Sequence, residues 1–291
     1  MNPFRQHYVS YIAPQLKKME DERKIIEKRM LIIALSYSIV LTIIVVWLYI
    51  VLQNLNVIFL FLSLPIPLTL FSKELVRNYS KKYKETVIRH LFLSYFDSFV
   101  IDTEKKYQIY DLKKTGFLPF KKQIEIDTED FITLTHKGKT IQLQEILLKQ
   151  GNEIGFKGLL FSMDLKPYVN QIFTITHQTN KYINKFFGDE FQTLKINDIN
   201  VLYQGEFDIE LSRPFIEIAR SNQISISIQN NKIHCLIPSD GNTVDDKMEM
   251  FEPMLTSEYN SSSTYSFIQS EYFRINKISK IILKLEEINV A

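Results

Sequence analysis

The longest hydrophobic pattern in the chain is Met30–Phe71, which contains no Asp, Glu, Lys, Arg or His. Its first part, Met30–Leu52, has about the 20 apolar residues that a helix needs to cross the hydrocarbon core of a bilayer. The alternative, a buried helix of a soluble core, seldom runs so long without a charge. The second part, Val57–Phe71, carries Pro65 and Pro67, so it is either a kinked span or a re-entrant segment. The pattern predicts a two-helix transmembrane hairpin over residues 30–71.

Amphipathic patterns flank this hairpin on both sides. Residues 1–29 are expected to form a cytoplasmic N-terminal helix after a break at Pro14, with Arg23 inside the apolar stripe. This helix is an extension of the first span; a short coiled coil and a membrane-surface helix are the alternatives. Residues 72–98 are expected to form a membrane-proximal amphipathic helix that begins at Ser72 and ends near Phe96. Its apolar residues recur every four positions: Leu75, Tyr79, Tyr83, Val87, Leu91 and Tyr95.

Alternating apolar and polar residues predict a cytoplasmic α+β domain over residues 99–253, made of mostly antiparallel strands plus helices. Two hairpins are expected, one through Lys137–Lys139 and one through Asn230–Asn231. The expected strands are Phe131–His136, Thr140–Gln144, Phe156–Met163, Ile172–Thr176, Val201–Tyr203, Ile224–Ile228 and Lys232–Ile237; the expected helices are Tyr182–Phe187 and Leu211–Ala219. Residues 254–291 are expected to form a polar linker and a C-terminal helix, Phe267–Ile288.

The distribution of charge predicts the orientation in the membrane. The chain has 35 basic and 33 acidic residues, but both flanks of the hairpin are basic, and the residues beyond His90 carry 22 basic and 27 acidic side chains. Because Lys and Arg stay preferentially on the cytoplasmic side, both termini are expected in the cytoplasm. Anionic lipid headgroups are possible partners through Lys73, Lys81, Lys82 and Lys84.

The amino-acid composition predicts the cellular compartment and the kind of organism. Cys235 is the single cysteine, which fits a reducing compartment. The long polar segment before Met30 argues against a secretory signal and for a retained anchor. Abundant Ile, Lys, Asn, Phe and Tyr with only eight Gly indicate an AT-rich bacterial genome, so the expected location is the bacterial inner membrane.

No motif predicts a catalytic, cofactor-binding or metal-binding residue. Gly151, Gly155 and Gly158 match neither nucleotide-binding spacing and are expected to lie in turns before a strand. The acidic segment Asp240–Glu252 lacks the glycine of an EF-hand loop, and the five histidines form no ligand pair. His234 and Cys235 are expected on opposite faces of one strand, with Cys235 in the core. The acidic balance beyond His90 argues against nucleic acid as a partner.

Several segments resemble a bacterial family known as domain of unknown function 3137. The resemblance covers roughly Phe4–Pro253 and is carried by the basic N-terminal helix, the hairpin, Phe156-Lys-Gly-Leu-Leu-Phe161 and a late block. This block consists of Leu211-Ser-Arg-Pro-Phe-Ile-Glu-Ile-Ala-Arg220, Ile224-Ser-Ile-Ser-Ile228, Lys232-Ile-His-Cys-Leu-Ile-Pro238 and Phe251-Glu-Pro253. The resemblance implies an inner-membrane location and a cytoplasmic α+β domain, and it supplies no catalytic residues.

These observations favour a non-enzymatic membrane protein whose cytoplasmic domain binds a protein partner or a lipid surface. Two alternatives stay open: a membrane-attached enzyme that uses the acidic residues of Asp240–Glu252, and a lipid or small-molecule carrier, which requires a large apolar cavity in the strand-rich region.

Overall fold

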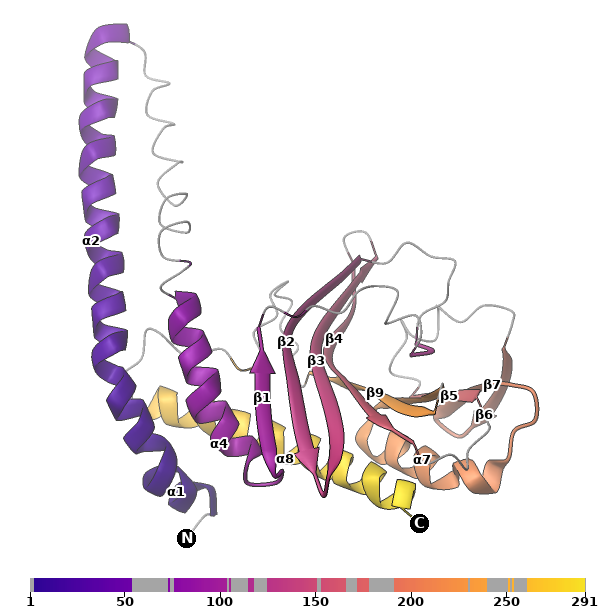
Figure 1. Cartoon of the computed structure of the whole chain (residues 1–291). Helices are drawn as coiled ribbons and strands as arrows, with labels where there is room; N and C mark the ends of the chain where they lie inside the picture. Colours follow the sequence, from indigo (N-terminus) through magenta and orange to yellow (C-terminus); the bar gives the residue numbers. More distant parts are fainter. Residues whose placement is uncertain are drawn as a thin grey trace. The chain divides into compact units, whose positions relative to one another are not determined.

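The computed structural model describes residues 3–53, 73, 76–103, 105, 115–117, 125–150, 153–165, 172–177, 191–229, 231–239, 251, 253 and 261–290. The fold is α+β, with a long N-terminal helix and a large antiparallel sheet (Figure 1). The chain divides into two compact units. Met1–His90 and Phe251–Tyr272 make up the helical unit, and Leu91–Met250 and Phe273–Ala291 make up the sheet unit.

Pro14 does not break the N-terminal helix, contrary to the prediction. α1 (Pro3–His7) runs through one π-helical turn, η1 (Tyr8–Ile12), into α2 (Ala13–Leu52). Pro14 has no N–H to donate, and its ring would clash with the carbonyl group of Ser10 in a regular α-helix. The wider turn accommodates the ring, and the N–H of Ala13 donates to the carbonyl oxygen of Tyr8, five residues earlier.

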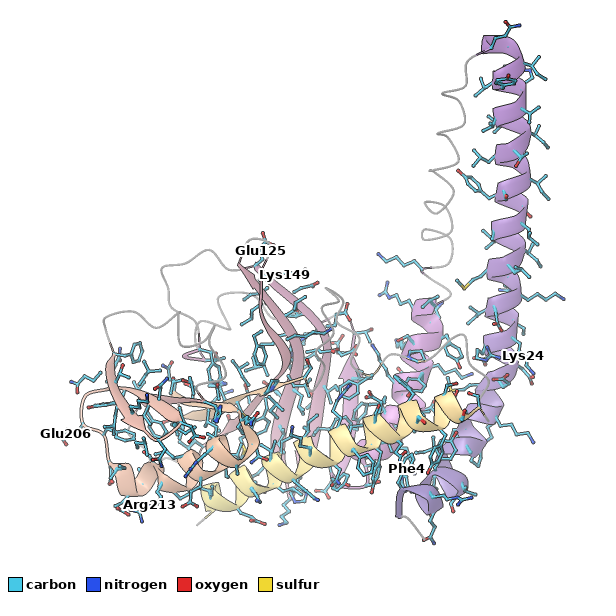
Figure 2. All side chains as sticks on the ribbon, turned by 180° about the vertical axis from the view of Figure 1, so that it is seen from behind. Phe4, Lys24, Glu125, Lys149, Glu206 and Arg213 are labelled. Atoms are coloured by element: carbon cyan, nitrogen blue, oxygen red, sulfur yellow. The ribbon has the colours of Figure 1, made fainter. Side chains whose placement is uncertain are left out.

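The outer part of α2 carries the largest exposed apolar surface among the described residues. Figure 2 shows side chains projecting outward around this helix beyond Lys24. The exposed large apolar residues are Leu31, Ile32, Leu35, Ile39, Val40, Ile43, Ile44, Val46, Trp47, Tyr49, Ile50 and Val51. Within the described part of the chain, Phe4–Val51 is one helix long and apolar enough to cross a membrane. The predicted second run, Val57–Phe71, lies outside the described residues.

A buried ion-pair cluster stabilises the charged part of α2. Arg23 is only 5% exposed, as its position within the apolar stripe requires. Its guanidinium donates two hydrogen bonds to the Glu20 carboxylate, at 2.9 and 2.8 Å, and a third to Glu27 at 3.0 Å. The hydrogen bond with Glu20 raises the pKa of Arg23. Lys82 forms an ion pair with Glu22.

The described residues 76–92 are helical, as predicted, but the helix ends four residues before the predicted Phe96. Helical residues 76–83 continue through a second π-helical turn, η3 (Lys84–Ile88), into α4 (Arg89–Phe92). Residues 93–95 then form a turn, in which the N–H of Tyr95 donates to the carbonyl oxygen of Phe92 at 2.9 Å. Tyr79, Tyr83 and Val87 are buried, as their four-residue spacing predicts.

The described strands of the sheet unit form one nine-stranded antiparallel sheet with the order β1-β2-β3-β4-β9-β8-β5-β7-β6. The strands are β1 (Ser98–Asp102), β2 (Glu125–His136), β3 (Lys139–Gln150), β4 (Glu153–Asp164), β5 (Ile172–His177), β6 (Gln192–Ile196), β7 (Ile199–Gln204), β8 (Ser225–Gln229) and β9 (Lys232–Pro238). Both predicted hairpins are confirmed. Lys137, Gly138 and Asn231 have the positive φ that such turns demand.

Helices lie along one face of the sheet (Figure 1). α7 (Ile209–Asn222) begins at the N-cap Asp208, and its Phe215 packs against Phe173 of β5 with ring centroids 6.2 Å apart. α8 (Ser262–Val290) is longer than the predicted Phe267–Ile288. In the sheet unit, Glu286 of α8 pairs with Lys139 at 3.3 Å, which ties the helix to the β2–β3 hairpin.

The opposite face of the sheet carries a polar row through its centre. Ser162, His234, Ser227 and Thr174 are directly paired across β4, β9, β8 and β5, so their side chains share one face. All four are buried. Beside this row lies an apolar cluster made of Phe117, Ile146, Leu148, Phe156, Leu160 and Leu236.

Two expectations for the sheet unit are corrected. Gly155 and Gly158 lie inside β4 and not in a turn before it. β6 has no predicted counterpart, because its residues are mostly polar and exposed. The predicted helix Tyr182–Phe187 lies outside the described residues, as does most of the acidic segment Asp240–Glu252. The five-part division of the chain at residues 29, 71, 98 and 253 remains a prediction.

Candidate functional site

The described residues that were considered for chemistry in the sequence are not gathered into a metal or catalytic site. Within the described ranges, no group of three or more His, Cys, Asp or Glu side chains is placed to hold a metal ion. Cys235 lies in β9 and is completely buried, and this burial raises the pKa of its thiol. A buried thiol with a raised pKa carries little of the reactive thiolate. Cys235 is therefore a core residue, as predicted.

The structure brings His234 against Ser162, a pairing that the sequence did not reveal. The Ser162 hydroxyl and His234 Nδ1 are 2.8 Å apart. Burial, assisted by the charge of Lys232, lowers the pKa of His234 to about 4. A general base works best with a pKa near the working pH, so this imidazole is poorly matched to activate the hydroxyl. Together with the hydrogen bond from Thr174 to Ser227, the pair satisfies buried polar groups of the sheet.

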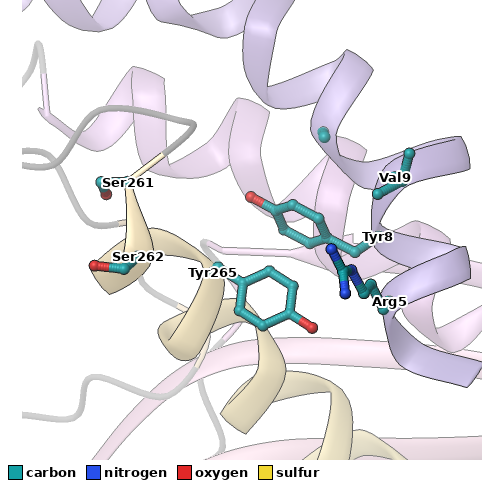
Figure 3. A pocket seen from close by; sticks show the side chains of 7 residues that line it. Arg5, Tyr8, Val9, Ser261, Ser262 and Tyr265 are labelled. Atoms are coloured by element: carbon teal, nitrogen blue, oxygen red, sulfur yellow. The ribbon is translucent and has the colours of Figure 1, made fainter. Parts of the chain in front are cut away.

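The helical unit contains a cavity of about 540 Å³ (Figure 3). It lies between the start of the N-terminal helix and the start of α8. Its walls are mainly apolar and aromatic, with a few polar groups. The lining residues are Arg5, Tyr8, Val9, Ala13, Ser261, Ser262 and Tyr265.

The π-helical turn explains how the N-terminal side of the cavity is built. Tyr8 and Val9 are the first residues of η1, and Ala13 follows its end. An extra residue in one turn changes the direction of the side chains that precede it relative to those that follow. Turns of this kind occur frequently at functional sites. Here the turn that Pro14 requires contributes two of the lining residues, Tyr8 and Val9, and Ala13 lies directly after it.

An aromatic cluster supports the cavity wall. Tyr8 and Tyr265 are in edge-to-face contact, with ring centroids 4.9 Å apart. Phe4 is completely buried and lies 5.8 Å from Tyr8, 5.3 Å from Tyr265 and 5.0 Å from Tyr272. Such aromatic contacts stabilise the pair beyond the area that they bury. The wall therefore has a defined shape.

The charged group at the cavity is a cation. Arg5 is exposed, and the described lining residues include no carboxylate. Ser261 lies at the start of α8, where its hydroxyl accepts a hydrogen bond from the N–H of Thr264 at 3.1 Å. The 29-residue α8 has no acidic residue in its first turn, so no carboxylate within that turn offsets the partial positive charge of its N-terminus.

Two histidines beside the aromatic cluster add no further positive charge at neutral pH. His7 and His90 are stacked with ring centroids 5.0 Å apart. Burial lowers the pKa of His7, and the neighbouring His90 lowers it further. Burial also lowers the pKa of His90. Both imidazoles are therefore neutral near pH 7, and Arg5 supplies the side-chain charge at the cavity.

Comparisons with known proteins do not assign this site. No protein-family model and no curated protein sequence matches the chain. The resemblance to domain of unknown function 3137 therefore stays a prediction. One similar solved structure is the crystal structure of the mycobacterial trehalose monomycolate transport factor A. It is 9% identical, with a TM-score of 0.34, over 70% of this chain and 94% of that chain. A likeness at this level carries no argument about function.

Proposed function

We propose that the protein is a bacterial inner-membrane protein with two spans, whose cytoplasmic α+β domain is a protein- or lipid-interaction module. The observation that carries the proposal is the apolar surface that α2 exposes from Leu31 to Val51. A contiguous exposed apolar surface is costly in water and marks a contact with a membrane or a partner. Because this surface extends along the helix for about the thickness of a bilayer, lipid is the covering that fits it.

The charges next to the apolar run support an orientation with both termini in the cytoplasm. Lys28 and Arg29 are exposed directly before the run, and Lys73 and Arg77 are exposed after it. Basic residues on both sides favour a second crossing by Val57–Phe71 that returns the chain to the cytoplasm.

The same basic residues support contacts with anionic lipid headgroups, each contributing about 1 kcal/mol near the surface. Lys73 and Lys81 are exposed, and Lys82 is half-exposed beside Glu22. Lys84 is buried, which argues against a headgroup contact for that residue.

Extraction and cysteine labelling test the proposal. We expect the full-length protein to stay in the membrane pellet after alkaline carbonate treatment. In intact spheroplasts, an impermeant maleimide should label the Gln53→Cys variant, and it should label Lys81→Cys only after permeabilisation. Buried Cys235 gives little background, because burial raises the pKa of its thiol. Recovery in the soluble fraction contradicts the anchor, and labelling of Lys81→Cys in intact spheroplasts contradicts the orientation.

The cavity favours a second candidate, a carrier of a lipid or small molecule. It lies in the helical unit and not in the strand-rich region, where a carrier cavity was expected. The alternative of a membrane-attached enzyme rests on residues 240–252, of which the structure describes only Phe251.

A further inference from the structure

We infer that the cavity of the helical unit binds an amphiphilic anion, a single phosphate or carboxylate group attached to an apolar body. This inference deepens the lipid-interaction part of the proposed function. It rests on the cavity, the cation at its edge and its aromatic wall, and not on the apolar run of α2.

The size of the cavity excludes a bare ion as its full occupant. Its volume of about 540 Å³ falls in the range of small-molecule sites, roughly 300 to 1,000 Å³. A phosphate or carboxylate group alone fills only a small part of such a space. The remainder is bounded by the rings of Tyr8 and Tyr265 and by the side chains of Val9 and Ala13. Removing these apolar surfaces from water by contact with an apolar ligand body is favourable in free energy, whereas contact with a polar body contributes little.

The polar groups select a negative charge. Figure 3 shows the guanidinium group of Arg5 on the side of the tyrosine rings, with Ser261 and Ser262 across the opening. A guanidinium binds phosphate and carboxylate with two parallel hydrogen bonds, which gives direction as well as attraction. The N-terminus of α8 adds partial positive charge on the other side of the opening. The described lining has no carboxylate that would repel the anion.

The site is preorganised for this ligand. Phe4 is buried behind both tyrosines, and the contact between Tyr8 and Tyr265 fixes the angle of their rings. Val9 is 59% exposed, although it is apolar and lies on the cavity wall. A bound amphiphile would cover Val9 with its apolar part and pair its anionic group with the exposed Arg5.

Calorimetric titration of the full-length protein tests the inference. The protein is placed in nanodiscs of zwitterionic phosphatidylcholine, and empty nanodiscs are titrated in parallel to subtract partitioning. The probes are dihexanoyl phosphatidic acid, octanoate and inorganic phosphate. We expect saturable 1:1 binding of at least one amphiphile, and at least 100-fold weaker binding of inorganic phosphate. The stronger of the two amphiphiles identifies the head group as phosphate or carboxylate.

Matched variants assign the binding to this cavity. Arg5→Gln should weaken the bound amphiphile at least tenfold, and Val9→Asp should weaken it by a similar factor through repulsion. Lys18→Gln removes an exposed cation of α2 that does not line the cavity, so this variant should bind the amphiphile within twofold of the wild type. Absence of saturable binding, or equal binding by wild type and Arg5→Gln, overturns the inference. A protein that resists carbonate extraction but binds neither amphiphile refutes the cavity ligand and leaves the membrane anchor standing.

Discussion

Gly158 occupies a position in β4 where no larger side chain fits. A Cβ atom there would lie 2.2 Å from the carbonyl oxygen of Ile237 and 3.0 Å from Cα of Pro238, both in the neighbouring strand β9. These are backbone atoms, so they yield only if the strands separate. We expect Gly158→Ala to lower the free energy of unfolding by about 2 kcal/mol or more, as overpacking does in other cores.

Gly138 supplies the control for this substitution. It has a φ of +78°, but nothing lies within 4 Å of the site of a new Cβ. Gly138→Ala therefore introduces only backbone strain, which costs about 1 kcal/mol. Urea unfolding of both full-length variants in detergent micelles, followed by near-ultraviolet circular dichroism, compares the two losses. Equal losses would show that β9 does not press against Gly158.

His234 should make the stability of the sheet unit depend on pH. Burial and Lys232 hold its pKa at about 4, whereas an unfolded histidine has a pKa of about 6.5. The unfolded chain therefore binds the proton first as pH falls, so the stabilisation is complete above pH 6.5 and is lost progressively towards pH 4. The full loss amounts to about 3 kcal/mol.

A His234→Gln variant isolates this contribution, because His7 and His90 also have lowered pKa values and remain in both proteins. Urea unfolding midpoints measured from pH 7.5 to pH 4.5 should fall more steeply for the wild type than for the variant. Parallel curves would contradict the assignment of the buried neutral state to His234.

At the residue scale, sequence patterns predicted on which face of the sheet a side chain lies, but not which residue it contacts. Alternation along the strand placed His234 and Cys235 on opposite faces, and the register with β4 agrees. The partner Ser162 lies 72 residues away, and the order of the strands brings the two together. No local spacing carries that information. A pairing of this kind becomes visible in a sequence only when the strand order is known.

At the scale of single elements, the stability of α2 depends on the buried ion pair between Arg23 and Glu20. Replacement of Arg23 by Met leaves the Glu20 carboxylate buried without the two hydrogen bonds from Arg23, while Lys24 lies 3.6 Å away. We expect Arg23→Met to lower the free energy of unfolding by about 3 kcal/mol, because removal of one partner from a buried pair leaves an uncompensated charge. The double variant Glu20→Gln/Arg23→Met should recover most of this loss. Additive losses in a double-mutant cycle, measured by urea unfolding, would contradict a direct coupling.

The elements that the sequence predicted correctly have strong periodic patterns. β2, β3 and β8 each contain an alternating stretch, and the turns that join β2 to β3 and β8 to β9 contain residues that tolerate a positive φ. β6 was missed because it has only two apolar residues, Leu194 and Ile196, which is too short an alternation to stand out. The wrong break at Pro14 has a different cause. A proline excludes a regular helical hydrogen bond, but the chain resolved the conflict with a wider turn and continued as a helix.

For the whole molecule, the sequence predicted the fold class and one long apolar helix but not the cavity. The lining comes from Arg5 to Ala13 and from Ser261 to Tyr265, two segments separated by almost the entire chain. Arg5 and Tyr8 fit an ordinary helix face, and Ser261 and Ser262 belong to a polar segment that was read as a linker. These residues line a common cavity only because Phe4 packs against Tyr265 and Tyr272, which brings the two segments together.

The membrane anchor can be tested by charges placed within and outside the apolar run of a single helix. Ile39 and Ile43 are exposed near the middle of the run, at 60% and 63%. An arginine at the centre of a span costs about 2.5 to 3.5 kcal/mol of insertion free energy. The variant Ile39→Arg/Ile43→Arg should therefore shift a large fraction of the full-length protein from the carbonate-resistant pellet to the extractable or aggregated fraction.

Ile25 provides the matched control, because it is 50% exposed on the same helix but lies before the charge-free run. Ile25→Arg places the same cation in a region that we assign to the cytoplasm, where arginine stays in water and favours the proposed orientation. We expect its extraction profile to match the wild type. If both variants behaved alike, the exposed apolar surface of α2 would face something other than lipid, such as an apolar surface of a protein partner.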